Sequence, residues 1–377
     1  MPSPTAIQPM RGRATPQGTL RYAARFQGRA AAGHFRQAAG ELLLPSIGIG
    51  TYLGEADAAT DARYTEAVIA AVKGGINLID SAINYRLQRS ERSVGRALRL
   101  LATQGFVREE IVLSTKAGFL TPDGAMPEDV EGYFLREFVE RGIFRPEDIV
   151  AGCHCLAPGF LADQLDRSLA NLGVESVDVF YLHNPETQLS EISVEEFRRR
   201  IAAAFQFLET AVEAHKIGAY GLATWNSFRE DPKTAGYLSL ASMEQVAREA
   251  GGPNHHFRFL QLPLNLAMPE ALLRANQIVA GKTMAIVQAA RALGITLITS
   301  AALLQGQLTR NLPPYIGQAL GLSRPSSQAL QFARSVPGVT TALVGMSQVR
   351  HVESNLELVA VEPAPRDHFL KLFEPPQ

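Results

Sequence analysis

From residue 41 onward, short runs of apolar, often β-branched residues alternate with longer segments in which apolar positions recur on one helical face. Continuous apolar runs are typical of parallel strands that are buried on both faces. Their alternation with helical segments predicts βα units that build a parallel sheet. The predicted strands are residues 46–51, 76–80, 111–116, 177–183, 219–224, 259–263, 295–300 and 340–345.

A segment with helical periodicity follows each strand. The segment 61–73 places Ala67, Val68 and Ala71 on one face and stops at Gly74-Gly75, a pair suited to the left-handed residue that ends many helices. The remaining helices are predicted at 90–101, 160–172, 194–214, 239–250, 283–293, 326–335 and 349–358. Strands and helices in strict alternation predict one α/β domain, a single (β/α)8 TIM barrel. A doubly wound sheet is the alternative, but no G-x-G-x-x-G motif follows the first strand.

The segment that precedes the barrel is rich in arginine. Residues 1–40 contain Arg11, Arg13, Arg21, Arg25, Arg29 and Arg36 and no acidic residue before Glu41. A transit peptide and an RNA-binding arm are both open alternatives, and we expect instead a poorly ordered arm that packs loosely on the barrel of residues 41–377. The end of this arm, HFRQAAGELLLPS, predicts a hairpin that turns near Ala39-Gly40 and covers the lower end of the barrel.

Two connections are too long for simple turns. Residues 117–150 follow the third strand and residues 301–325 follow the seventh. Long loops in a compact domain are usually functional or disordered. In a barrel both lie on the C-terminal face of the strands, where active sites form.

Composition limits the classes of partner. With 36 basic and 37 acidic residues, the chain gives no indication of a nucleic-acid partner. No apolar run approaches the roughly 18 residues of a membrane span. The two cysteines, Cys153 and Cys155, are too close in sequence to form a typical disulfide, so we expect a cytoplasmic protein. We expect no metal either, because Cys153-His154-Cys155 lacks a fourth ligand at a familiar spacing.

Ionisable residues stand at or just beyond the ends of three consecutive strands: Asp80 and Tyr85 after the second, Lys116 after the third, and His183 after the fourth. A lysine that ends a buried strand needs a partner, and Asp80 is the nearest candidate. A lysine close to Tyr85 stabilises the phenolate, so we expect a lowered pKa and a general acid for a carbonyl oxygen. Each residue alone also has a structural interpretation, as a cap, a phosphate anchor or a packing group. The interpretation as a catalytic site depends on their occurring together.

These segments resemble the signature blocks of the aldo-keto reductase superfamily. The resemblance runs over roughly residues 40–360 and includes GGINLIDSAINY, VLSTK, SLANLGVESVDVFYLHNP and KIGAYGLATWN. It implies that Asp80, Tyr85, Lys116 and His183 form the catalytic tetrad of that family. It also implies a nicotinamide dinucleotide, NADP with NAD as the second candidate, bound across the barrel mouth without a Rossmann motif.

The resemblance also implies cofactor contacts, and here the chain departs from the family pattern. Ala223-Thr224 replaces the usual Ser-Asn pair, Ser300 replaces a stacking tyrosine, and Gln348 replaces a basic residue near the 2′-phosphate. The residues expected to bind the cofactor are Thr224, Asn226, Gln261, Ser300, Gly345, Ser347, Arg350 and Asn355.

The resemblance implies an NAD(P)H-dependent oxidoreductase that reduces an aldehyde or ketone to an alcohol, or runs in reverse. The expected partner is therefore a small-molecule carbonyl or alcohol, and the chain a monomer or weak homo-oligomer. A regulatory partner subunit that binds the cofactor with little turnover is one alternative. A phosphate-binding isomerase or aldolase that uses Lys116 as a Schiff base is another.

Overall fold

A closed barrel of eight parallel strands forms the centre of the computed structural model, which describes residues 8–373. Each barrel strand overlaps one of the predicted strands, so the predicted (β/α)8 fold is confirmed. In barrel order from the first strand they are β3 (Ile47–Gly50), β4 (Leu78–Asp80), β5 (Val112–Ala117), β8 (Val177–His183), β9 (Ile217–Ala223), β10 (Phe257–Pro263), β13 (Thr296–Ser300) and β14 (Val339–Gly345).

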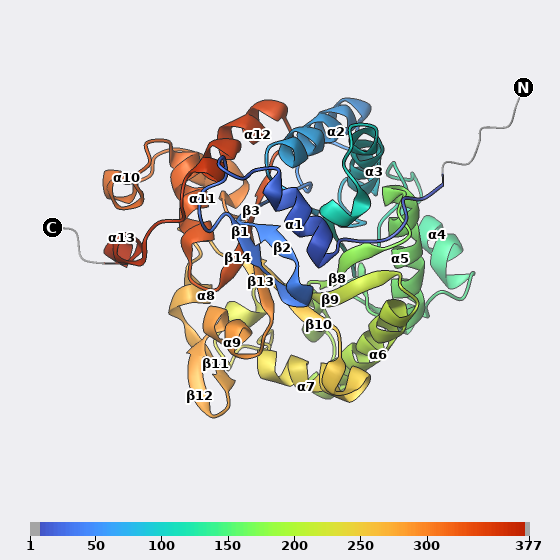
Figure 1. Ribbon diagram of the computed structural model, residues 1–377. Helices are drawn as coiled ribbons and strands as arrows, with labels where there is room; N and C mark the ends of the chain where they lie inside the picture. Colours follow the sequence, from blue (N-terminus) through green and yellow to red (C-terminus); the bar gives the residue numbers. More distant parts are fainter. Residues whose placement is uncertain (1–7, 374–377) are drawn as a thin grey trace, which may run out of the picture.

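Helices surround the barrel as an outer ring (Figure 1). Asp57 caps the first of them by accepting from the Thr60 amide, and Gly75, with a φ of 109°, follows its last turn. The helices of the ring are α2 (Ala58–Lys73), α3 (Arg89–Ala102), α5 (Pro158–Leu172), α6 (Val194–Glu213), α7 (Leu240–Gly251), α9 (Ile286–Ala292), α11 (Pro325–Ser335) and α12 (Val349–Leu356). Short helices α8 (Glu270–Leu273) and α13 (Arg366–Leu370) lie outside this repeat.

The predicted start of the helix at 283–293 is wrong. Residues 283–285 were predicted as the start of a helix, but Lys282–Ala285 forms strand β12, which pairs antiparallel with β11 (Ala275–Val279). The turn between them is Ala280-Gly281, and both residues have positive φ values, 50° and 75°. A glycine at such a turn closes a hairpin at little steric cost. The helix therefore begins only at Ile286.

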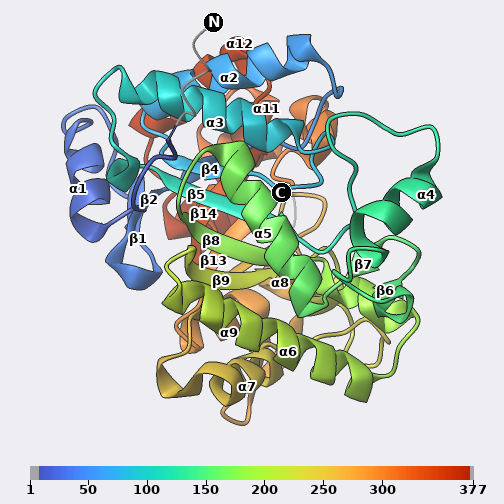
Figure 2. The same cartoon turned by 90° about the vertical axis from the view of Figure 1, so that its right-hand side faces the viewer.

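The hairpin predicted before the barrel is confirmed. Strands β1 (Phe35–Gln37) and β2 (Leu43–Pro45) pair antiparallel, and the Ala39 amide donates to Thr296 Oγ1 at the start of β13 (2.8 Å). Fully buried Leu44 joins the apolar cluster that fills the barrel interior. Figure 2 shows this hairpin at one end of the barrel and the long loop with β6 and β7 at the other.

The described part of the arginine-rich arm is not loosely packed, which corrects the prediction. Helix α1 (Pro16–Ala24) starts at Thr15, whose side chain accepts from the Gly18 amide. Tyr22 is fully buried and its hydroxyl donates to the Val72 carbonyl (2.5 Å). The Ala14 amide donates to Asp178 of the barrel (2.6 Å). The buried ring and these bonds order the arm; its residues 1–7 lie outside the described residues.

The two long connections lie on the C-terminal face, as predicted. The first contains α4 (Val130–Phe134) and ends in the two-residue strands β6 (Ile149–Val150) and β7 (His154–Cys155). The second contains α10 (Pro314–Leu320). Both cysteines are free thiols. No helix in the range 8–373 is long and apolar enough to cross a membrane.

Candidate active site

A cavity of about 880 Å³ opens where the barrel strands end. Its volume lies within the range of pockets that hold cofactors and small ligands. Its lining includes residues from the strand ends and from the loops and helices that follow them: Tyr52, Tyr64, Asp80, Asn84, Tyr85, Phe119, His183, Asn184, Thr224, Trp225, Gln261, Ser300, Gly345, Ser347, His351, Ser354 and Asn355.

A buried ion pair lies at the base of this cavity. Lys116 Nζ donates to Asp80 Oδ2 (2.6 Å) and to the Ser81 carbonyl (2.7 Å). Asp80 Oδ1 accepts from Ser114 Oγ (2.7 Å) and from Gln261 Nε2 (2.9 Å). Burial alone would lower the pKa of Lys116, but Asp80 and Tyr85 outweigh it and hold that pKa above its ordinary value. Lys116 is therefore a fixed positive charge.

Tyr85 lies between this charge and two aromatic rings. Lys116 Nζ is 4.8 Å from the centre of the Tyr85 ring. The rings of Tyr52 and His183 pack edge-on against Tyr85 at centroid distances of 5.0 and 5.8 Å. Burial raises the pKa of Tyr85 above its ordinary value, although Lys116 acts in the opposite direction. The expectation of a lowered pKa is thus wrong here, because desolvation of the phenolate outweighs the lysine.

His183 is a neutral imidazole at this position. Burial, and then the charge of Lys116, hold its pKa well below the ordinary value. Its Nδ1 is buried and has no hydrogen-bond partner among the described residues. Phe119 packs edge-on against both His183 (5.2 Å) and His154 (4.9 Å), which fixes the ring from the side. A neutral imidazole with a free nitrogen can bind a carbonyl or hydroxyl oxygen.

The residues predicted to bind the cofactor fall into two groups. Six of them line the cavity: Thr224, Gln261, Ser300, Gly345, Ser347 and Asn355. The other two do not. Asn226 accepts from Arg229 Nη2 (3.2 Å) in the loop after β9, and Arg350 is exposed on α12.

Glu186 holds the loop that carries Trp225. Its Oε1 accepts from the Trp225 amide (2.7 Å), and burial raises the pKa of the carboxyl above its ordinary value. The Trp225 side chain lines the cavity and is 41% exposed. A ligand in this cavity therefore changes the environment of the only tryptophan in the chain.

The cavity residues fit a nicotinamide dinucleotide. Thr224 Oγ1 is buried and finds no hydrogen-bond partner in the part of the chain that the structure describes, so it is free to bind a carboxamide. At the end of β14, Gly345 and Ser347 precede α12. The side chain of Gln348, the N-cap residue of this helix, makes no capping hydrogen bond. The free amides of that first turn suit a pyrophosphate.

Two asparagines that line the cavity, Asn84 and Asn184, were not among the predicted site residues. Asn84 immediately precedes Tyr85, and its Oδ1 is buried with no partner within residues 8–373. Asn184 follows His183 and has a φ of 46°, a conformation that asparagine tolerates better than most residues. The His-Asn-Pro sequence was the available signal for Asn184, because a turn is needed there to leave the strand.

Comparison with known proteins shows which family the chain is similar to. A family model described as "Aldo/keto reductase family" matches residues 46–246. The NADH-specific methylglyoxal reductase of Escherichia coli K12 is 27% identical over 158 residues, 42% of this chain and 40% of that protein. The D-threo-aldose 1-dehydrogenase of a Pseudomonas species is 28% identical over 191 residues, 50% of this chain and 52% of that protein. The chain therefore spans about half or less of the length of these curated relatives.

Solved structures resemble the chain over almost its whole length. The glycerol dehydrogenase of Gluconobacter oxydans superimposes with a TM-score of 0.63 at 18% identity, covering 91% of this chain and 94% of that one. An aldo/keto reductase of Klebsiella pneumoniae in complex with NADP and acetate gives a TM-score of 0.61 at 18% identity, covering 91% and 96%. At such identities the likeness concerns the fold.

Proposed function

Because this chain belongs to the aldo/keto reductase family, we propose that it reduces an aldehyde or ketone to an alcohol, or catalyses the reverse reaction, with a nicotinamide dinucleotide. The arrangement of Lys116 between Asp80 and the ring of Tyr85, beside His183, supports the proposal most directly. A phenol and a neutral imidazole thus line the cavity and a buried cation lies against the phenol ring, which is a set of groups suited to carbonyl reduction.

The proposed mechanism assigns one task to each side chain. His183 binds the carbonyl oxygen and orients it toward Tyr85. The Tyr85 hydroxyl gives its proton to that oxygen, and Lys116 stabilises the phenolate that remains. Asp80 keeps Lys116 charged and in place. A nicotinamide bound beside these residues would supply the hydride for the carbonyl carbon.

We assign the cofactor to the two ends of the cavity. Thr224 would bind the carboxamide, with Ser300 beside it, and the amides at the start of α12 would bind the pyrophosphate, with Gly345, Ser347 and Asn355. Gln261 contacts Asp80, so its proposed role is to hold that carboxylate while lying next to the cofactor. NADP is the first candidate. NAD stays the second, because Arg350 is exposed and does not line the cavity, so no contact to a 2′-phosphate is assigned to it.

The proposed substrate is a small carbonyl compound that enters between Tyr52, Phe119 and Trp225. We also propose a cytoplasmic monomer or weak homo-oligomer, in keeping with two free thiols. A measurement of cofactor binding and of turnover also tests the regulatory alternative, in which the chain binds cofactor with little turnover.

The experiment titrates the purified protein with NADPH and with NADH and follows Trp225 emission. A panel of aldehydes and ketones is then added, and absorbance of the reduced cofactor is recorded. We expect quenching followed by substrate-dependent oxidation of the cofactor. Quenching without turnover would favour the regulatory alternative, and absence of quenching with both cofactors would refute the proposal.

Tyr85→Phe should abolish turnover and leave cofactor binding nearly unchanged. The substitution removes only the hydroxyl that donates the proton, and loss of a general acid costs roughly a 10²- to 10⁴-fold drop in rate. Steady-state kinetics give kcat, and Trp225 quenching gives the cofactor Kd. A fully active Tyr85→Phe enzyme would contradict the role of Tyr85 as acid.

A further inference from the structure

Three consecutive residues that directly follow Tyr85 have left-handed backbone conformations. Arg86, Leu87 and Gln88 have φ values of 51°, 56° and 70°, and none of them is glycine. The left-handed conformation costs a residue with a Cβ atom about 1 kcal/mol or more. Such strain persists only where the surrounding structure holds the backbone in place. Contacts between this segment and its surroundings should therefore hold its backbone in the left-handed conformation.

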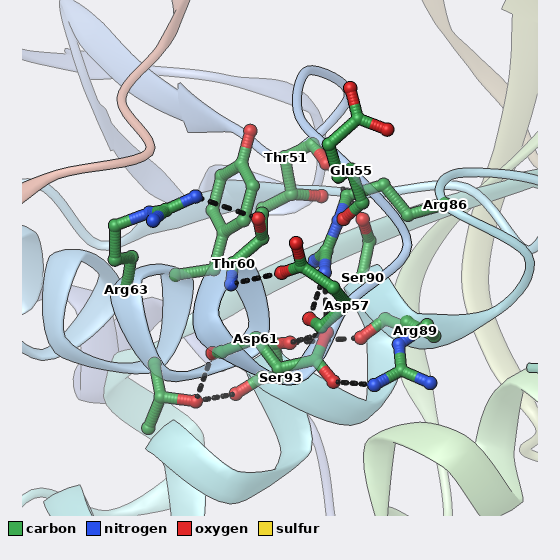
Figure 3. A network of polar contacts seen from close by, with 12 residues as sticks. Thr51, Glu55, Asp57, Thr60, Asp61, Arg63, Arg86, Arg89, Ser90 and Ser93 are labelled. Atoms are coloured by element: carbon green, nitrogen blue, oxygen red, sulfur yellow. Dashed lines mark hydrogen bonds and ion pairs between the residues drawn. The ribbon is translucent and has the colours of Figure 1, made fainter.

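The side chain of Arg86 supplies these contacts (Figure 3). The side chain is 1% exposed, and its guanidinium forms a salt bridge with Asp61 in the first turn of α2. Nε donates to the Glu55 carbonyl (2.8 Å) and Nη2 to the Asp57 carbonyl (3.3 Å). The same group lies over the ring of Tyr64, 5.2 Å from its centre. Arg86 thus contacts the loop between β3 and α2 at several points.

That loop also forms part of the cavity wall. It carries Tyr52, whose ring packs against Tyr85 at 5.0 Å, and Leu53, whose carbonyl accepts from the Tyr64 hydroxyl (2.6 Å). Ser90, at the far end of the strained segment, donates to the Thr51 carbonyl (2.7 Å). The loops that bear Tyr85 and Tyr52 are therefore tied together on both sides of the strained turn.

We propose that Arg86 is a positioning residue, which fixes the hydroxyl of Tyr85 and the ring of Tyr52 relative to each other by bonding the β3–α2 loop to the turn after Tyr85. The inference rests on the proposed function in that Tyr85 is the acid. A turn alone would not require this side chain, because glycine adopts the same backbone without strain. Nor is Arg86 needed to neutralise the charge of Asp61, because Arg89 Nη2 is bonded to the other oxygen of that carboxylate (2.6 Å).

Arg86→Gly separates positioning from folding. Glycine relieves strain at residue 86, and Asp61 keeps Arg89 as its partner, so the variant should unfold within a few degrees of the wild type. We expect kcat to fall at least 10-fold while the cofactor Kd changes less than 2-fold. Arg86→Lys keeps one charge near Asp61 and should restore part of kcat. Arg63→Ala is the matched control, because Arg63 belongs to the same network but, within residues 8–373, its side chain donates only to Thr60 Oγ1 (2.7 Å).

A second readout does not depend on turnover. Tyrosine labelled with ¹³C at Cζ gives one NMR signal for Tyr85, assigned by its loss in Tyr85→Phe. We expect this signal to shift or broaden in Arg86→Gly and to stay unchanged in Arg63→Ala. Asp61→Asn weakens the same contact independently and should shift the signal in the same direction, which keeps the test valid if Arg86→Gly does not fold.

The outcomes separate the two proposals. Wild-type kcat and an unshifted Tyr85 signal in Arg86→Gly, or an unshifted signal in Asp61→Asn if the glycine variant does not fold, would overturn the role of Arg86. A wild-type enzyme without turnover on any carbonyl would refute the proposed function. In that case a shifted Tyr85 signal in Arg86→Gly would still support the positioning of Tyr85.

Discussion

At Tyr85, burial and the charge of Lys116 act on the same hydroxyl in opposite directions. Burial dominates and raises the pKa of Tyr85, while it also keeps His183 neutral by lowering the pKa of that imidazole. Over a wide range of pH, both groups are therefore in the protonation state that the proposed reduction requires. The site thus needs no ionisation event before it reacts.

The pH dependence of reduction follows from these directions. The ordinary pKa is 6.5 for histidine and 10.0 for tyrosine, and the shifts move His183 below and Tyr85 above these values. Because the proposed acid is the protonated phenol, kcat for reduction should be level between about pH 6.5 and 9 and fall only at higher pH. Rates at constant ionic strength with saturating cofactor measure this. A decline with a midpoint below pH 8 would contradict it.

The positions of the four proposed catalytic residues could be predicted from sequence because the ends of adjacent barrel strands lie side by side. The bond between Gln261 and Asp80 could not, since the two residues are 181 positions apart and nothing local indicates it. The strain after Tyr85 was equally hidden. Arg86, Leu87 and Gln88 are not residues that favour positive φ, so only the folded backbone reveals the turn.

Among the elements, the regular βα units and the β1–β2 hairpin were predicted, but the β11–β12 hairpin and helix α1 were not. The hairpin of β11 and β12 was missed because Thr283 and Met284 also fit the helical pattern that follows. Helix α1 was missed because its buried face consists of Gly18, Thr19 and Tyr22, which form no apolar run. Pro16 after Thr15 was the available signal, since proline favours the first turn and threonine the N-cap.

The hairpin of β1 and β2 is attached to the barrel through a buried histidine. His34 Nδ1 lies 3.1 Å from Ser46 Oγ, and Nε2 lies 3.0 Å from the Gly75 carbonyl. Ser46 Oγ also accepts from Arg334 Nη1 (3.0 Å). Burial lowers the pKa of His34 to about 4, and Arg334 and Arg36 act in the same direction. A proton on His34 would thus face a buried cation.

This attachment should make the fold sensitive to acid. The pKa of His34 is lower in the folded chain than the ordinary 6.5, so the unfolded chain binds the proton more tightly. The free energy of unfolding should therefore fall as pH drops from 6.5 to 4, by about 3 kcal/mol from this residue. Urea titrations at several pH values measure it. His34→Gln should be less stable than the wild type at pH 7, but its free energy of unfolding should fall less steeply between pH 6.5 and 4. Part of the fall remains in the variant because the pKa of His154 is also lowered to about 4. Equal slopes for the variant and the wild type would contradict the role of His34.

At the scale of the whole molecule, the described N-terminal residues form part of the barrel's support. Tyr22 packs against Phe26, Phe35 and Phe106, and Arg25 forms a salt bridge with Glu110. The boundary predicted near residue 40 separates an arginine-rich segment without acidic residues from the barrel, so it marks a change in composition. We propose that residues 8–40 unfold together with the barrel.

Tyr22→Ala tests this proposal. Removing a fully buried aromatic side chain should lower the free energy of unfolding by about 3–5 kcal/mol. Leu20→Ala on the same helix is the matched control, because Leu20 is 59% exposed and its loss should cost less than about 0.5 kcal/mol. Urea denaturation followed by circular dichroism gives both values. Equal stability of the two variants would show that the N-terminal segment is detachable.

The contacts of the N-terminal segment also have a consequence for the order in which the molecule assembles. Ala14 binds Asp178, and Ala31 donates its amide to Val359. During synthesis both partners leave the ribosome long after the N-terminal segment does. Ala14 and Ala31 can therefore reach their final places only after the barrel strands that lie between them and their partners in the sequence have been made.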